Sequence, residues 1–393
     1  MIIEPKVNGF LCATAHPAGC REHVRREIEY MRSRGKKEFR QAPPKSVLVI
    51  GCSAGYGLSA RIAAAYGYGA ATLGICRERE PSESRTASPG YYNYHAFDEL
   101  AGQDGLWAKT LNEDAFRRST KEKAARILRE EMGPAELVIY SLAAPKRTMP
   151  DGSVVRSALK TTGEHFVGRD LDLNTMEVRE VTIDAATPRE IEDSVKVMGG
   201  EDWYEWIRIL SEAGALAEKA VTVAFSYLGP EITYPIYLHG TMGQAKKHLY
   251  ETSRKITENF RDRSVQGYIS MNKSMVTQAS IAIPRAPIYI AIAKKVMEEE
   301  GCYEDCIRQM DRLLCQKMAP GEPPEVDEEN RIRMDDLELQ PHIQEKITER
   351  METVTTESVE ELAGLAGYRE DFYHMYGFGY GNVDYEADIS HFI

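Results

Sequence analysis

The sequence predicts an α/β fold in which a doubly wound parallel sheet is covered by helices on both faces. A short apolar run over 47–50, rich in β-branched residues, is typical of a buried strand, and a glycine-rich turn leads from it into a helix over 58–66 that Gly67 ends. Strand patterns and helix patterns then alternate along the chain to about residue 270. Strands separated by helices pair in parallel and are covered on both faces, so this alternation predicts the sheet.

The remaining elements are predicted from the same two periodicities. A charged helix over about 21–39 precedes the first strand, and Pro43 and Pro44 separate the two. Further strands are predicted at 69–76, 136–143, 221–225 and 265–270, and further helices at 113–133, within 187–213, at 241–260 and within 286–320.

Two parts of the chain depart from this alternation. Residues 146–186 are polar and rich in Gly, Thr and Asp, which is typical of inserted hairpins over an edge of the sheet. Residues 320–345 carry an acidic stretch, densest over 325–330, which we interpret as a solvated surface or a helix cap and not as a binding site. We therefore expect a single domain over 1–393, enlarged by N-terminal, inserted and C-terminal segments.

Composition excludes several classes of partner. The formal net charge is -12, so the basic surface that nucleic acids and anionic membranes require is not expected. The chain has no run of 18 or more apolar residues and no leader pattern at its start, so we expect no membrane span and a cytoplasmic location. Seven cysteines, with no C-x-x-C pair, predict reduced thiols, and the scattered His and Cys residues predict no metal site.

Gly51, Gly55 and Gly57 follow the first strand with the spacing G-x-x-x-G-x-G. A strand, a glycine turn and a helix are the context of a dinucleotide fingerprint. Gly51 would allow the tight turn, Gly55 would let the backbone approach a diphosphate, and Gly57 would let the helix pack against the strand. The diphosphate would lie on the free N–H groups at the helix N-terminus. The pattern therefore predicts a Rossmann-type nucleotide site; a strand, turn and helix without a ligand is the alternative.

Glu78 follows the second predicted strand, at the position that meets the adenosine ribose in such folds. A carboxylate there binds the ribose 2′-hydroxyl and repels a 2′-phosphate, which favours NADH. Arg77 and Arg79 flank it and would accept a phosphate, so NADPH is the weaker alternative.

A phenol and a lysine, Tyr237 and Lys246, follow the strand predicted at 221–225, at the edge of the sheet where ligands bind. A phenol has a pKa of about 10, and a nearby ammonium would lower that pKa and make the phenol a better proton donor. The alternative is that the tyrosines of this segment are core residues and that Lys246 is solvent-exposed.

The spacing of this pair requires a break in the backbone. Residues nine apart lie on roughly opposite faces of a continuous helix. Gly240 supplies the break, and Thr241 with Gln244 fits a capping box in which Thr241 is the N-cap. Lys246 is therefore expected in the first turns of a helix, and Tyr237 on the segment that leads into it.

The glycine spacing resembles that of the short-chain dehydrogenases and reductases. Together with the Tyr237-x8-Lys246 spacing, the motif at 51–57 resembles the trans-2-enoyl-CoA reductase and FabV-type enoyl-acyl carrier protein reductase family. The resemblance covers nearly the whole chain and includes 8–20, 140–143, 197–203, 272–277, 326–333 and 365–369. One departure is Arg77, where the family often has an aromatic residue.

This resemblance implies NADH-dependent reduction of the 2,3-trans double bond of an enoyl-CoA or an enoyl-acyl carrier protein. Tyr237 would donate the proton and stabilise the enolate, Lys246 would assist it, and Tyr227 would contact the acyl substrate, under covering segments at about 146–186 and 286–393. The implied cofactor-binding residues are Gly51, Cys52, Ser53, Ala54, Gly55, Tyr56, Arg77, Glu78, Asp114, Ala115, Leu142, Ala143, Lys246, Met275, Val276 and Thr277.

Two other functions are compatible with the same residues. A short-chain-type NAD(P)H carbonyl reductase or epimerase would place Tyr237 at a carbonyl oxygen instead of an enolate. A non-catalytic NAD(H) sensor would bind the cofactor without turnover. We expect a monomer, because the sequence shows no coiled coil and no long apolar edge. The choice between coenzyme A and a carrier protein, and between fatty-acid synthesis and fermentative reoxidation of NADH, is left open by the sequence.

Overall fold

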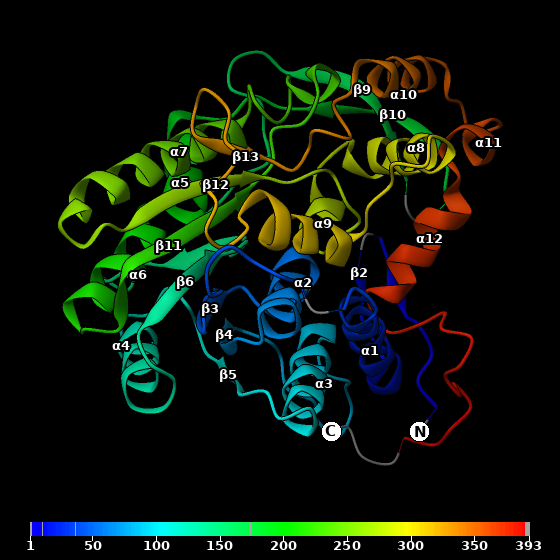
Figure 1. The fold of residues 1–393 in the computed structure, drawn as a ribbon. Coiled ribbons are helices and arrows are strands. Elements are labelled where there is room, and N and C mark those ends of the chain that lie inside the picture. Colours follow the sequence, from blue (N-terminus) through cyan, green and yellow to red (C-terminus); the bar gives the residue numbers. More distant parts are fainter. Residues whose placement is uncertain (1, 10, 36, 173–174, 390–393) are drawn as a thin grey trace.

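The structure, a computed structural model, describes residues 2–9, 11–35, 37–172 and 175–389 (Figure 1). Its centre is a sheet of seven parallel strands in the order β13-β12-β11-β6-β3-β4-β5. The strands are β3 Ser46–Ile50, β4 Ala71–Cys76, β5 Ala108–Asn112, β6 Ala135–Tyr140, β11 Leu216–Ser226, β12 Gln266–Met271 and β13 Arg331–Arg333. The chain runs outward from β3 to β5 and then crosses to β6, so the strand order reverses beside β3. The predicted doubly wound parallel sheet is confirmed.

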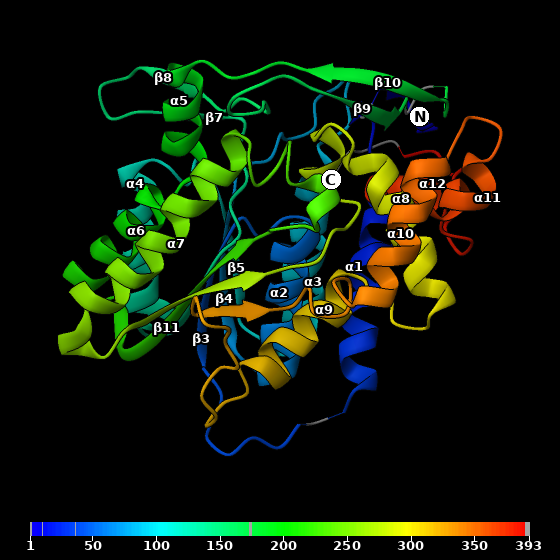
Figure 2. The ribbon, with the colours of Figure 1, turned by 90° about the horizontal axis from the view of Figure 1, so that it is seen from above.

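Alternate side chains of β3 face two different cores. Val47 and Val49 pack with the helices on one face, and Leu48 and Ile50 pack with those on the other. The first face is covered by α1 Pro17–Ser33, α2 Gly55–Ala63, α3 Pro89–Gln103 and α9 Cys306–Arg312, and the second by α4 Arg118–Ile127, α6 Glu201–Glu212 and α7 Thr241–Asn259 (Figure 2). Helix α5, Pro188–Met198, packs against α7.

A third core surrounds α8, Ala286–Glu299. The C-terminal helices α10 Pro341–Thr353, α11 Val359–Ala363 and α12 Leu365–His374 all contact it (Figure 1). A hairpin formed by β9 Phe166–Leu171 and β10 Val178–Ile183 packs on the same helix. A second hairpin joins β7 Lys146–Thr148 to β8 Val154–Arg156, so the hairpins expected within 146–186 are present. A short N-terminal pair, β1 Val7–Asn8 and β2 Leu11–Cys12, completes the strands described.

Several predicted helix bounds are wrong. The first helix spans 17–33, because Pro17 occupies its first turn and His16 caps its N-terminus. The helix predicted at 58–66 begins at Gly55 and continues past Gly67 as the π-helical turn η1 Ala64–Tyr68, until Gly69 ends it with a φ of 70°. The helix predicted at 113–133 begins at Arg118 and ends in the π-helical turn η2 Leu128–Met132.

The elements β1, β2, α10, α11 and α12 were not predicted, and neither were three elements of the central layers: α3, β5 and β13. Strands β5 and β13 lie at the edges of the sheet, where side chains are only partly buried and the apolar run that marks a central strand is missing. The buried face of α3 is made of aromatic and small residues with one Asn, and it has no Leu, Ile or Val. The strand predicted at 136–143 ends at Tyr140, which leaves 141–143 in the loop.

No helix of the described residues is both long and apolar enough to cross a bilayer.

Candidate active site

The turn after β3 is built from backbone contacts that exclude side chains. Gly51 has a φ of +86°, and a Cβ there would lie 2.5 Å from the carbonyl oxygen of Ser141. A Cβ on Gly57 would lie 1.8 Å from the carbonyl oxygen of Gly51. No side chain fits at either position, so these glycines have the local roles predicted for them, the tight turn and the close packing of α2.

Gly55 begins α2 with a φ of +50°, and a Cβ there would lie 3.3 Å from Cγ2 of Thr277. The N-cap of this helix is Ala54, so no capping side chain competes for the N–H groups of the first turn. Uncapped N–H groups at the positive end of a helix bind anions. The turn therefore fits the diphosphate of a dinucleotide.

Glu78 is held at the end of β4 by three polar side chains. The hydroxyl of Ser53 donates to its Oε1 and the hydroxyl of Ser88 to its Oε2, each at 2.5 Å. The side chain of Asn112 accepts from the Glu78 N–H at 2.6 Å and donates to its carbonyl oxygen at 3.1 Å. A Cβ on Gly90 would lie 2.2 Å from Oε1, so a glycine is needed beside the carboxylate. The carboxylate is thus fixed against the glycine turn, where a ribose would lie.

Arg77 pairs with a different carboxylate. Its guanidinium donates to Asp114 at 2.9 Å, although the Arg77 side chain is 66% exposed. Arg79 donates to the carbonyl oxygen of Thr86 at 3.4 Å. Each arginine beside Glu78 therefore already has a protein acceptor, which lessens the case for a 2′-phosphate site.

Two further strand ends meet the glycine turn. Ser141, Leu142 and Ala143 follow β6, and the carbonyl oxygen of Ser141 lies against Gly51. The segment 275–277 follows β12 and brings Thr277 against Gly55. From the turn, the hydroxyl of Tyr56 donates to the carbonyl oxygen of Lys273 at 2.8 Å. Of the residues expected to bind the cofactor, 51–56, Glu78, Leu142, Ala143 and 275–277 thus follow the ends of parallel strands on one edge of the sheet.

Tyr227 and Tyr237 form a pair after the end of β11. Their ring centroids are 5.0 Å apart with planes at 81°, and the Tyr237 side chain is buried. The backbone between them turns through the short 3₁₀ helix η3, Glu231–Thr233, and the N–H of Tyr237 donates to the carbonyl oxygen of Thr233 at 3.0 Å. The two phenols named by the resemblance therefore lie together at the carboxyl edge of the sheet.

The predicted break before Lys246 is present, but the predicted capping box is wrong. Helix α7 begins at Thr241 with Gly240 as its N-cap, and no side chain caps it. The hydroxyl of Thr241 instead donates to the carbonyl oxygen of Ala158. Gly243 lets the first turn approach the preceding segment, since a Cβ there would lie 1.9 Å from the carbonyl oxygen of Leu238.

The electrostatics of the pair differ from those predicted. Burial and, to a smaller extent, Tyr250 raise the pKa of Tyr237, so the expected lowering by an ammonium is wrong. Burial lowers the pKa of Lys246 to about 8. The ammonium of Lys246 has no hydrogen bond or ion pair with any other described residue. The phenol is therefore a neutral donor, and the lysine is a poorly solvated amine without a protein partner.

A cavity of about 710 Å³ lies elsewhere, beside the C-terminal end of α1, and is lined by Lys37, Phe39, Arg40 and Tyr68 among others. Its charged residues are already paired, Lys37 with Asp311 and Arg40 with Glu322. The strand ends, and not this cavity, carry the convergent polar groups of a reaction site.

Three family models match consecutive parts of the chain. Residues 2–83 match the NAD(P)H binding domain of trans-2-enoyl-CoA reductase, residues 85–319 its catalytic region, and residues 326–389 an enoyl reductase FAD binding domain. The chain belongs to the trans-2-enoyl-CoA reductase family. The family expected from the glycine motif and the Tyr-x8-Lys spacing is confirmed.

Relatives of the trans-2-enoyl-CoA reductase family match over almost the full length. An enoyl-[acyl-carrier-protein] reductase [NADH] of Flavobacterium johnsoniae is 46% identical over 99% of this chain and 98% of its own length. The crystal structure of Treponema denticola trans-2-enoyl-CoA reductase in complex with NAD is 43% identical, with a TM-score of 0.95 over 99% of this chain and 98% of that one. The Clostridium acetobutulicum trans-2-enoyl-CoA reductase in complex with NADH is 38% identical, with the same TM-score and the same shares.

The third family model raises the question of a flavin, and the residues present do not fit one. The apolar side chains of α10, α11 and α12 pack around α8. A Cβ on Gly377 would lie 2.5 Å from the carbonyl oxygen of His16, and one on Gly364 would lie 3.1 Å from the Lys295 side chain. Gly381 has open space around it, but Gly364 and Gly377 face protein atoms and form no open cradle for a diphosphate, so we assign no flavin chemistry to the described residues of this segment.

Sequence reasoning missed two buried charges near the site. Glu338 falls within the acidic stretch interpreted as solvated, yet it is 0% exposed and accepts hydrogen bonds from Ser274. Lys121, on a helix predicted only as charged, forms a buried ion pair with Asp202 at 2.7 Å. Both partners lie far away in the sequence, so no local pattern marks either contact.

Proposed function

We propose that this chain reduces the 2,3-trans double bond of enoyl thioesters with NADH, with Tyr237 as the group that stabilises the enolate. The reaction class follows from membership of the trans-2-enoyl-CoA reductase family. One observation supports the residue assignment: the Tyr227–Tyr237 pair follows β11 at the carboxyl edge of the sheet, the edge that also carries the glycine turn after β3.

When bound, NADH supplies the hydride for the β-carbon of the substrate. Negative charge then develops on the thioester oxygen, and a hydrogen-bond donor held at that oxygen lowers the barrier. Because burial raises the pKa of Tyr237, this phenol stays protonated and donates without carrying charge in the ground state. Tyr227 contacts the acyl substrate, and its ring packs edge to face with the ring of Tyr237.

Lys246 binds the ribose hydroxyls of the cofactor in this proposal. Its ammonium has no partner among the described residues and is available to a ligand. The other residues that would hold the cofactor are those already named on the resemblance, with the uncapped N–H groups of α2 at the diphosphate. Glu78, fixed by Ser53 and Ser88, accepts from the adenosine ribose and favours NADH over NADPH.

We further propose that residues 146–186 and 286–393 cover the bound acyl chain within a single domain, and that the protein acts as a cytoplasmic monomer. The curated relatives are named for acyl carrier protein and the solved structures for coenzyme A, so both carriers are substrates to test.

Steady-state oxidation of NADH tests the function. We expect fast turnover with crotonyl-CoA and little with acetoacetyl-CoA, because the site stabilises an enolate and not an alkoxide. A carbonyl reductase would give the opposite preference. A sensor would bind NADH and turn over neither substrate. Repeating the assay with crotonyl-acyl carrier protein and with NADPH resolves the carrier and the nicotinamide.

A further inference from the structure

Glu338 is a fully buried carboxylate that joins the C-terminal segment to the end of β12. Its Oε2 accepts from the Ser274 N–H at 2.9 Å, and its Oε1 accepts from the hydroxyls of Ser274 at 2.6 Å and Tyr289 at 2.7 Å. The amide of Gln344 donates to the Glu338 carbonyl oxygen at 2.7 Å. A buried carboxylate is costly unless it is hydrogen-bonded, so these contacts fix the positions of the residues that share them.

Ser274 begins the segment that reaches the glycine turn. It follows Lys273, whose carbonyl oxygen accepts from the hydroxyl of Tyr56. It precedes 275–277, which ends with Thr277 against Gly55. The segment is therefore attached to the cofactor turn on one side and to Glu338 on the other.

The same carboxylate also acts electrostatically on the substrate-side phenol. Burial, and after it the charge of Glu338, raise the pKa of Tyr227 well above its ordinary value. Both effects favour the neutral, donating form of the Tyr227 hydroxyl. Glu338 thus contacts the segment that reaches the cofactor turn directly and acts on Tyr227 only through its charge.

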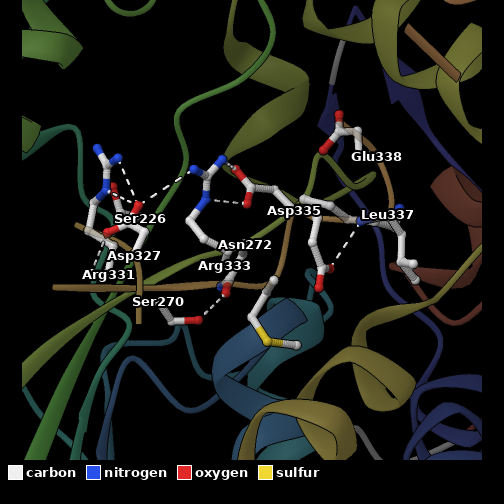
Figure 3. A network of polar contacts seen from close by, with 12 residues as sticks. Ser226, Ser270, Asn272, Asp327, Arg331, Arg333, Asp335, Leu337 and Glu338 are labelled. Atoms are coloured by element: carbon white, nitrogen blue, oxygen red, sulfur yellow. Dashed lines mark hydrogen bonds and ion pairs between the residues drawn. The ribbon is translucent and has the colours of Figure 1, made fainter. Parts of the chain in front are cut away.

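Ion pairs hold the chain that carries Glu338 in place. Figure 3 shows Arg331 of β13 paired with Asp327, and Arg333 paired with Asp335, three residues before Glu338. The distances are 2.8 and 2.7 Å. These ion pairs stabilise the local backbone around β13, and the pairing of β13 with β12, the strand that leads to Ser274, fixes the two segments relative to each other.

We propose that Glu338 is a positioning residue of the reductase site, which aligns the 274–277 segment with the cofactor. This inference rests on the proposed function and deepens it. It gives the C-terminal segment a role in the reductase reaction in place of the flavin binding for which its family model is named.

The substitution Glu338→Gln tests the role of the carboxylate. The amide has the same size but no charge. Its NH2 group either faces the Ser274 N–H, which cannot accept, or requires the hydroxyls of Ser274 and Tyr289 to reverse from donors to acceptors, so the charge-assisted bonds are lost in either orientation. We expect the KM for NADH to rise and kcat to fall, each by roughly tenfold. With NADH deuterated at the transferred position, we expect a larger isotope effect on kcat, because a misaligned hydride transfer becomes more rate-limiting.

Controls separate this role from a loss of stability. A variant that is only less stable contains less active enzyme and keeps the wild-type KM and isotope effect. Glu345→Gln makes the same change on the exposed face of α10 and should leave all three quantities unchanged. Ser274→Ala removes one donor to Glu338 and should change the KM for NADH, kcat and the isotope effect in the same direction but by less. This variant serves as the test if Glu338→Gln does not fold.

The outcomes distinguish this proposal from the proposed function. A wild-type enzyme that does not oxidise NADH with crotonyl-CoA overturns the proposed function. An active wild-type enzyme whose Glu338→Gln or Ser274→Ala variant keeps the wild-type KM for NADH and isotope effect overturns the role of Glu338 alone. A stoichiometric flavin in the purified protein would also overturn the role given to this segment.

Discussion

The ring of Tyr227 meets the ring of Tyr237 edge to face, with centroids 5.0 Å apart. This geometry is favourable because the positive edge of one ring faces the negative face of the other. The attraction depends on the rings and not on the hydroxyls. Removal of either hydroxyl should therefore leave the packing intact and report on chemistry alone.

Tyr237→Phe should lower kcat with crotonyl-CoA by about 10²–10³, which is the loss typical of one oxyanion-type donor. The KM for the thioester should change far less, because the contact strengthens mainly in the transition state. Tyr227→Phe should cost less in kcat. Steady-state kinetics measure both, and Tyr66→Phe, whose hydroxyl contacts Asp104, is the matched control. If Tyr227→Phe were the inactive variant instead, the roles of the two phenols would be reversed.

The pH dependence of cofactor capture should report on Lys246. Burial lowers the pKa of this amine to about 8, so the ammonium exists below that pH and the neutral amine above it. Since kcat/KM reports the free enzyme, kcat/KM for NADH should fall as the pH rises through about 8. Lys246→Met should have a low kcat/KM for NADH at every pH and should lack the fall near pH 8. A Lys246→Met profile that kept the wild-type limb would assign the titration to another group.

Glu78→Ala should raise the efficiency of NADPH relative to NADH by roughly tenfold, or about 1.4 kcal/mol, because the charge that repels a 2′-phosphate is removed. Glu80→Ala, an exposed change two residues away, is the control. The measurement is the ratio of kcat/KM for the two nicotinamides. An unchanged ratio would show that Glu78 does not face the ribose.

Lys121→Met should destabilise the fold. Its amine donates to Asp202 at 2.7 Å and to the carbonyl oxygens of Ala115 and Phe116 at 2.8 and 3.0 Å. Loss of one partner from a buried pair costs about 3–5 kcal/mol in the free energy of unfolding. Denaturant unfolding measures this, and Lys121→Met combined with Asp202→Asn should recover part of the loss. A double variant less stable than the single one would contradict this account.

The sheet was predictable where its strands are central. Leu48 and Val49 of β3 are buried on both faces, so the strand is a continuous apolar run. The edge strands β5 and β13 lack such a run because one side of each has no neighbouring strand. The helix predicted at 241–260 starts at Thr241 as expected, but its cap was predicted wrongly because a tertiary contact decides it: Thr241 matched a capping box, and its hydroxyl bonds Ala158 instead.

The candidate site was predictable where local spacing determines it. The close contact between Gly57 and Gly51 follows from a motif of a few residues. Gly55 shows the limit of that reasoning: its φ of +50° and its contact with Thr277 mean that any side chain strains the fold as well as the proposed diphosphate site. Glu338 could not be predicted, because its partner Ser274 is 64 residues away and only the packed fold joins them.

The fate of the hydride tests the central claim most directly. NADH deuterated at the transferred position is oxidised with crotonyl-CoA in ordinary water, and the product is analysed by mass spectrometry and NMR. This account predicts butyryl-CoA with one deuterium at the β-carbon and a solvent-derived proton at the α-carbon. A product labelled at a carbonyl-derived carbon, or label that stays in the nicotinamide, would contradict it.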